Sequence, residues 1–245
     1  LWKQFNFTFV DSKTNKLNSI AIMIDSIILK QPEGTYLKDP QGSELGINIL
    51  KASIELIEEI GIEDFTFKKL SIRIESTEAS VYRYFESKHQ LLLYLYSWYW
   101  GWKMMEIDRA THFISNDFEK LTTALELLIQ QENKTSFAFS FSYEKLRKLI
   151  EKEGIKSFLT KKVDDENQLG AFDNYKKMVV LLSSWVVATK PDFQFPNMLI
   201  TTIIEGAHLQ HYFGNHLQKL TNHSTANDNV ATFYKQLVHS LLQNK

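Results

Sequence analysis

Residues 77–88, TEASVYRYFESK, gather side chains that can hydrogen-bond to phosphates and to base edges. Thr77 and Ala79 are compact enough to approach bases at the start of a short helix. Arg83 and Lys88 supply cations for phosphate oxygens, and a tyrosine between them can lay its ring against a sugar and its hydroxyl on a phosphate. This combination predicts a surface that contacts the backbone and groove of a nucleic-acid duplex.

A second candidate cluster lies near the C-terminus, where Glu205 and His208 have the Glu-x-x-His spacing of carboxylate di-iron bundles. Such a site needs two pairs of this kind and two further glutamates on facing helices. The other Glu-x-x-His pair, Glu86 with His89, straddles a predicted corner between helices and cannot join a bundle core. We therefore expect hydrogen-bonded polar residues in a helix interface, with no metal and no cofactor.

The sequence contains no motif for catalysis. It has no nucleophile elbow, no glycine-rich phosphate loop and no cysteine, which excludes disulfides and thiolate-bound metals. The formal net charge is −1, so the bulk charge identifies no partner. The most apolar run, residues 91–102, is shorter than the roughly 20 residues of a membrane span. We expect a cytoplasmic protein that is not an enzyme.

The elements that must position these residues are helices, because only 9 glycines and 4 prolines interrupt 245 residues. Apolar residues recur at helical spacing after four candidate N-caps: Ser43, Thr66, Thr77 and Ser87. Gly61 is expected to end the first helix in a left-handed conformation. Gln90 completes a capping box at the start of a long fourth helix. The short break between the second and third helices is typical of a helix-turn-helix.

The remainder of the chain also predicts helices, over residues 117–131, 143–153, 170–190, 197–217 and 226–243. Residues 31–46 are rich in helix breakers and predict a linker. The chain starts at Leu1, and residues 1–19 leave three interpretations open: a genuine arm, an unusual start, or sequence upstream of a start at Met23.

The charge of the predicted helix-turn-helix is mixed. The cations between residues 65 and 88 are Lys68, Lys69, Arg73, Arg83 and Lys88, and the acids are Glu75, Glu78 and Glu86. Five cations against three acids leave an excess of two positive charges. Affinity for DNA is therefore expected to be modest per subunit and sensitive to salt, and a dimer would double the phosphate contacts.

Three segments resemble the DNA-binding domain of the TetR family of bacterial regulators: ILKASIELIEEIG (49–61), FTFKKLSIRI (65–74) and ASVYRYFESKHQLL (79–92). The resemblance implies an all-α homodimer with a small-molecule pocket in its C-terminal domain. The family usually has glycine in the turn where this chain has Glu75. Glu75 must therefore adopt the left-handed conformation at some cost, or shift the turn.

The resemblance also implies roles for single residues. The implied phosphate contacts are Thr66, Ser80, Tyr84 and Lys88. The residues implied to face bases are Thr77, Glu78 and Ala79, with Tyr82 at the DNA surface. The flanking cations that complete the expected DNA-binding set are Lys68, Lys69 and Arg83.

The predicted long fourth helix is crowded with large rings: Tyr94, Tyr96, Trp98, Tyr99, Trp100 and Trp102. Most of them are expected in the core, and one or two are expected to line a pocket as well. The candidate pocket residues are Trp98, Trp102, Met105, Phe141 and Trp185. The effector expected there is a small apolar or amphipathic molecule.

Residues 196–221 resemble the penultimate helix of a Bacteroidetes-type branch of these regulators, and such helices normally form a dimer interface. The candidate interface residues are Leu199, Ile203, Gly206, Gln210, Phe213, Leu217, Phe233, Leu237 and Leu241.

These observations predict an all-α protein with an N-terminal extension or linker at 1–42, a helix-turn-helix domain at 43–103 and a helical effector-binding and dimerisation domain at 104–245. The expected function is that of a ligand-responsive repressor, acting as a homodimer on a palindromic operator in double-stranded DNA, with no membrane partner. The alternative is a helical-bundle ligand-binding protein or carboxylate-metal enzyme whose helix-turn-helix has lost DNA reading.

Overall fold

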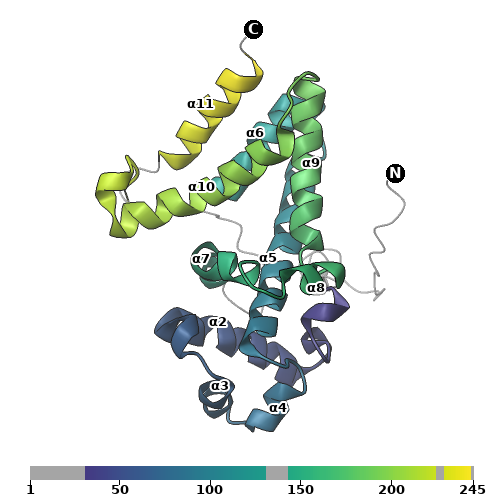
Figure 1. Cartoon of the computed structure of the whole chain (residues 1–245), viewed down its shortest axis with the longest axis vertical. Helices are drawn as coiled ribbons and strands as arrows, with labels where there is room; N and C mark the ends of the chain where they lie inside the picture. The colour runs from purple at the N-terminus through teal and green to yellow at the C-terminus, as the bar shows by residue number, and fades with distance from the viewer. Residues whose placement is uncertain (1–30, 131–142, 225–228, 244–245) are drawn as a thin grey trace, which may run out of the picture.

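The computed structural model describes residues 31–130, 143–224 and 229–243. The elements within these ranges are α-helices and short 3₁₀ turns, so the fold is all-α. A long central helix connects two parts of the molecule (Figure 1). At one end lie three helices joined by short turns, and at the other end lies a helical bundle. The predicted fold class is confirmed. Residues 1–30, including Met23, lie outside the described residues. None of the described helices has the length and apolar character needed to cross a membrane.

The α-helices are α2 (Glu44–Asp64), α3 (Phe67–Arg73), α4 (Glu78–Tyr82), α5 (Lys88–Thr111), α6 (Asp117–Ile129), α7 (Tyr143–Glu153), α8 (Val163–Gln168), α9 (Asp173–Thr189), α10 (Pro196–His216) and α11 (Val230–Leu242). Four 3₁₀ turns accompany them: η1 (Glu33–Thr35), η2 (Pro40–Gly42), η3 (Gly154–Ser157) and η4 (Gln218–Leu220).

The helix starts in the N-terminal half follow the predicted caps. Ser43, Thr66, Thr77 and Ser87 each accept a hydrogen bond from a backbone N–H in the first turn of the helix that follows. Such a cap satisfies one of the N–H groups that a helix start leaves without a partner. At Gly61 the backbone leaves the helical conformation, with φ 78°, and one further turn continues to Asp64. A residue with a side chain would be strained at this φ.

Residues 31–43 differ from the linker expected there, because they pack against the helix-turn-helix. The Leu37 N–H donates to the Tyr84 carbonyl oxygen at 2.8 Å, and the Tyr36 ring lies edge-on to Tyr94 with centroids 5.9 Å apart. Thr35 and Pro40 are buried. Hydrogen bonds between backbone groups do not depend on residue type, so the composition of this segment could not predict that it packs against the helices.

The bundle is built around α5, which packs against α6, α7 and α9. Helix α7 crosses between α2 and α10, and so links the two ends of the molecule (Figure 1). Helix α8 lies where the sequence predicted a connection without a helix. Three acidic residues in its first turn stabilise it, because the N-terminus of a helix carries a partial positive charge. Helix α9 begins at Asp173 rather than near Gly170, whose φ of 84° lies outside the helical range.

One ion pair is buried where α5 meets α6. Lys103 has no exposed surface, and its Nζ donates to Glu106 Oε2 at 3.0 Å and to the Leu127 carbonyl oxygen at 2.8 Å. The ammonium also lies 5.2 Å from the centroid of the Tyr143 ring. Burial lowers the pKa of Lys103, and the Glu106 carboxylate opposes that shift. The pair therefore depends on both members being present.

Gly46→Ala tests the close contact between η2 and α2. A Cβ at position 46 would lie 2.2 Å from the Pro40 carbonyl oxygen, so backbone must move. Overpacking of this kind should lower the free energy of unfolding by about 1–3 kcal/mol, measured by urea denaturation. Gly42→Ala is the control, because nothing lies within 4 Å of the added methyl group. Equal stability of the two variants would contradict the packing described.

Lys103→Met should destabilise the bundle by about 3–5 kcal/mol, since it removes the partner of a buried carboxylate. The double variant Lys103→Met/Glu106→Leu should recover most of that loss, because it removes both charges. Thermal and urea unfolding of the two variants measure the difference. A double variant less stable than Lys103→Met would show that Lys103 does not act mainly as the partner of Glu106.

Candidate nucleic-acid interface and effector cavity

Helices α3 and α4 form the end of the molecule farthest from α11 (Figure 1). The turn between them contains Glu75, the only non-glycine residue with positive φ in the described part of the chain, at 52°. The left-handed conformation expected of Glu75 is therefore present, and it costs roughly 1–2 kcal/mol relative to glycine. Two backbone hydrogen bonds hold the turn, from the Glu75 N–H to Ile72 and from the Ser76 N–H to Ser71.

Helix α4 presents the predicted base-facing residues at the surface. Thr77 and Ala79 are exposed, while Glu78 and Ser80 are half-buried. The hydroxyl oxygens of Thr77 and Ser80 lie 2.8 Å apart, so each orients the other. Tyr82 is 47 % exposed, yet its ring packs edge-on against Phe67 with centroids 5.0 Å apart. The start of α4 is thus exposed, and the Tyr82 ring packs its far end against α3.

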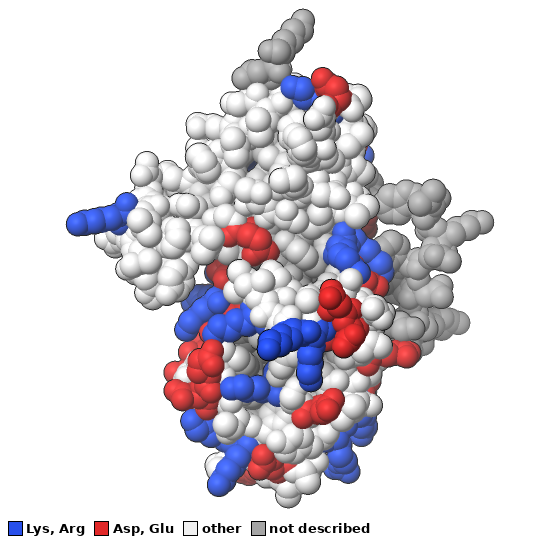
Figure 2. Space-filling view, in the orientation of Figure 1, with Lys and Arg blue, Asp and Glu red and all other residues white. Residues whose placement is uncertain are grey.

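Some cations of this surface have no ion pair with a described residue, and others are already bound to groups of the protein. Lys68 and Arg83 are exposed and make no ion pair with a described residue, and Lys69 donates to the Asp64 carbonyl oxygen at 2.9 Å. Arg73 is held instead by Glu59 at 2.7 Å and by Glu55 at 3.5 Å. Acidic and basic side chains therefore alternate over this end of the molecule (Figure 2).

Two residues with implied phosphate contacts are engaged within the protein. Tyr84 is only 3 % exposed, and its hydroxyl shares a hydrogen bond of 2.8 Å with Ser43. Lys88 is exposed, but its Nζ donates to the carbonyl oxygens of Ile62 and Glu63 at 2.9 and 3.0 Å. Lys88 therefore caps the C-terminal end of α2, and the phosphate roles of Tyr84 and Lys88 stay predictions.

A residue that the sequence analysis missed is Lys38, in the segment expected to be a linker. Its Nζ lies 3.4 Å from the Tyr84 hydroxyl and 5.0 Å from the centroid of that ring. An ammonium over a tyrosine ring is a cation–π contact. The sequence offered no signal for it, because the two residues are far apart along the chain.

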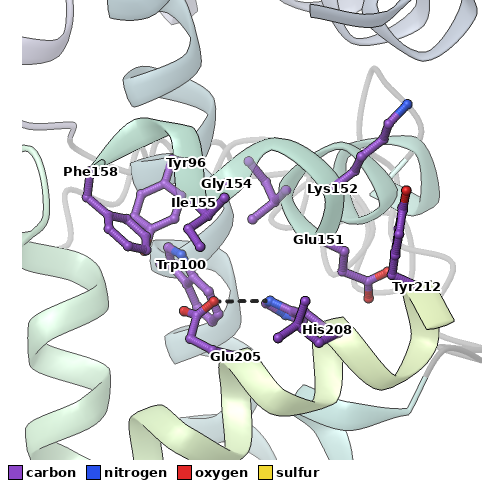
Figure 3. Close-up of a pocket in the computed structure, with 12 residues that line it drawn as sticks. Tyr96, Trp100, Glu151, Lys152, Gly154, Ile155, Phe158, Glu205, His208 and Tyr212 are labelled. Carbon is purple, nitrogen blue, oxygen red and sulfur yellow. Dashed lines mark ion pairs between the residues drawn. The ribbon is translucent and has the colours of Figure 1, made fainter. Parts of the chain in front are cut away.

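A cavity of about 200 Å³ opens in the C-terminal half, between α5, α7, η3 and α10 (Figure 3). Its lining residues are Tyr96, Trp100, Ile150, Glu151, Lys152, Gly154, Ile155, Phe158, Glu205, His208, Leu209 and Tyr212. None of the predicted pocket residues is among them, and Phe141 lies outside the described residues. Trp185 is buried and Met105 half-buried elsewhere in the bundle.

The difference arises from which face of α5 meets the cavity. Tyr96 and Trp100, one turn apart, line it, whereas Trp98 and Trp102 stack on each other with planes 6° apart and pack away from it. All the rings of the aromatic cluster are buried, as expected for most of them. A helix that is apolar on every side carries no periodicity that singles out one face.

Glu205 and His208 meet at this cavity, as their spacing allows. Glu205 Oε1 accepts a hydrogen bond from the Tyr175 hydroxyl at 2.9 Å, and Oε2 lies 3.9 Å from His208 Nδ1. Burial raises the pKa of Glu205. Burial also lowers the pKa of His208 to about 3, so this imidazole is neutral at pH 7. Among the residues that the structure describes, no group of three or more His, Cys, Asp or Glu could hold a metal ion.

The predicted dimer residues are split between the core and the surface. Leu199 and Ile203 are buried, and a Cβ on Gly206 would meet the Tyr234 hydroxyl at 2.1 Å. The exposed members are Leu217, Phe233 and Leu241, and the half-buried members are Gln210, Phe213 and Leu237. A further apolar surface that the sequence analysis missed contains Val180, Val187 and Met198, which are 61 %, 43 % and 65 % exposed.

Comparison with known proteins relates the helix-turn-helix segment to one family and the fold to several solved structures. Residues 49–95 match the family model described as bacterial regulatory proteins, tetR family. No curated protein sequence matches the chain. Similar solved structures are AibR in complex with isovaleryl coenzyme A and operator DNA, the fatty acid degradation regulator FadR from Bacillus halodurans, and superantigen PfiT.

These structures share the fold at low sequence identity. AibR is 15 % identical with a TM-score of 0.54, covering 80 % of this chain and 97 % of its own. FadR is 16 % identical with a TM-score of 0.53, covering 80 % and 93 %. PfiT is 13 % identical with a TM-score of 0.55, covering 85 % and 100 %. The helix-turn-helix segment, residues 49–95, therefore matches the tetR family of bacterial regulatory proteins.

Proposed function

We propose that the protein is a transcriptional repressor that binds a palindromic operator as a homodimer and responds to a small effector. The single observation that carries this proposal is the exposed start of α4 within a matched tetR-family segment. Under this proposal residues 43–103 form the DNA-binding domain, and residues 1–42 are its N-terminal extension or linker. Residues 104–245 bind the effector and the second subunit. No catalytic role is assigned.

The proposed reading of DNA uses α4 in the major groove. Thr77 and Ala79 would approach base edges, and Lys68, Lys69 and Arg83 would meet phosphates on the flanks. Glu78 could accept a hydrogen bond from a cytosine amino group. Because Arg73 is bound by α2, the effective positive charge of one subunit is small. Two subunits are therefore needed for useful affinity.

The proposed dimer uses the upper bundle. The face of the bundle seen in Figure 2 carries few charged side chains, in contrast to the lower end of the molecule. Val180, Ser184 and Val187 are exposed along one side of α9, at helical spacing. An exposed apolar stripe on a bundle is the usual signature of a surface that is buried in an assembly.

The proposed response to effector is carried by α5. This helix begins directly after the corner that follows α4 and contributes Tyr96 and Trp100 to the cavity. A ligand that binds one position of α5 more tightly than another would change the separation of the two α4 helices. The solved structure of AibR, with both isovaleryl coenzyme A and operator DNA, shows that this fold can hold both kinds of partner at once.

The rival proposal, a helical-bundle ligand-binding protein that no longer reads DNA, is favoured by the neutralised charge of Arg73. Binding of a fluorescent duplex from the region upstream of the protein's own gene separates the two. A repressor should bind this duplex specifically, with an affinity that falls steeply as salt rises. Affinity equal to that for a random duplex would favour the rival.

Arg83→Ala should weaken operator binding and flatten its salt dependence, because Arg83 is exposed with no ion pair to a described residue. Each lost phosphate contact lowers the slope of log K against log salt by about 0.9. Fluorescence anisotropy at several salt concentrations measures both effects. Lys161→Ala, which removes an exposed cation between η3 and α8, is the matched control and should leave the slope unchanged. A slope unaltered by Arg83→Ala would exclude its phosphate contact.

Val180→Asp should convert the dimer into a monomer, since it places a charge on the most exposed valine of the α9 stripe. Sedimentation equilibrium should give twice the 28.6 kDa chain mass for the wild type and the single mass for the variant. Ile72→Glu, at a side chain 70 % exposed on α3, is the control and should remain dimeric. A monomeric wild type would overturn the homodimer itself.

A further inference from the structure

The walls of the cavity are aromatic and come from separate elements. Tyr96 and Trp100 project from α5, Phe158 follows η3, and Tyr212 lies on α10 (Figure 3). The Tyr96 ring lies edge-on to both Trp100 and Phe158, with centroids 5.9 and 6.1 Å away. These three rings therefore pack against one another and form one aromatic wall of the cavity, and a cation that rests on such a wall is attracted by its π electrons.

The charged groups around the cavity leave one carboxylate without a cation among the described residues. Glu151 forms an ion pair with Arg147, so its charge is compensated. Lys152 lies at the rim and its side chain points away from the enclosed space (Figure 3). Glu205 is half-buried, with the Tyr175 phenol beside it. The His208 imidazole, 3.9 Å away and joined to it by the dashed line in Figure 3, is neutral because burial lowers its pKa to about 3.

The geometry at Glu205 leaves one oxygen open to a ligand. Oε1 is occupied by the Tyr175 hydroxyl, whereas the distance of 3.9 Å from Oε2 to His208 Nδ1 exceeds that of a hydrogen bond. The Trp100 ring lies close by, with its centroid 4.7 Å from that of Tyr175 and 6.2 Å from that of His208. A half-buried carboxylate with no cation beside it can form an ion pair with a cationic ligand.

Resting on the proposed function, we propose that the effector cavity takes a small organic cation: an amine or quaternary ammonium attached to a flat apolar body, with its charge between the Glu205 carboxylate and the Trp100 ring. The cavity of about 200 Å³ is smaller than the pockets of about 300–1,000 Å³ that hold drug-sized ligands, which favours a compact molecule. An anionic ligand would place like charges together at Glu205. The chemistry therefore differs from that of isovaleryl coenzyme A, the ligand in the AibR structure.

Calorimetric titration of the full chain with three matched probes tests this inference. The probes are benzyltrimethylammonium, its neutral isostere neopentylbenzene, in which carbon replaces nitrogen, and the anion phenylacetate. Benzyltrimethylammonium should bind at least tenfold more tightly than either of the others. Equal affinity for the cation and its isostere, tighter binding of phenylacetate, or binding of none of the three would overturn the proposal.

Glu205→Gln should weaken benzyltrimethylammonium binding at least tenfold and leave neopentylbenzene binding unchanged, because the amide keeps the size and the acceptor for Tyr175 but not the charge. Glu119→Gln, at an exposed position of α6, is the control and should bind as the wild type does. Circular dichroism confirms that each variant is folded. Retained cation affinity in a folded Glu205→Gln protein would show that the charge of Glu205 is not recognised.

Operator binding in the same samples separates this inference from the function on which it rests. A protein that binds its operator but not the cation would refute the ligand class and leave the repressor intact. A protein that binds the cation through Glu205 but no DNA would support the ligand class and refute the repressor. If both hold, benzyltrimethylammonium should change operator affinity in the wild type and not in Glu205→Gln.

Discussion

The burial of α5 is the constraint on which the rest of the structure depends. Its apolar stretch has no polar face, so every side must be covered, and α6, α7, α9 and η3 do so. Burying large rings dominates the energetics of such a core. The same helix starts at the corner after α4 and later lines the cavity, so it connects the two candidate sites.

Local rules explain why the N-terminal elements could be predicted. Caps such as Ser43 and Ser87 act within one turn. The left-handed conformation of Glu75 is expected from the resemblance, because the family usually has glycine at that position. The ends of α6 and α10 also agree with the predicted helices to within about two residues. Such features depend on neighbours in the chain, which the sequence contains.

The parts that could not be predicted depend on contacts between distant residues. Residues 31–43 dock through backbone groups, so their composition resembles that of a loop. On α5 the faces bearing Tyr96 and Trp98 are equally apolar, and only packing decides which one lines the cavity. The spacing predicted that Glu205 and His208 lie together, but only the fold shows that the nearby Arg147 pairs with Glu151 and not with Glu205.

The central claim is that two copies of α4 are presented together, spaced for adjacent turns of a duplex. Because the chain has no cysteine, Ala79→Cys gives a single spin-label site on the exposed start of α4. Pulsed electron spin resonance should give one label–label distance close to the half-site spacing of about 34–36 Å, sharpening on operator DNA. The absence of any dipolar distance, or a separation that stays far outside this range on DNA, would contradict the account.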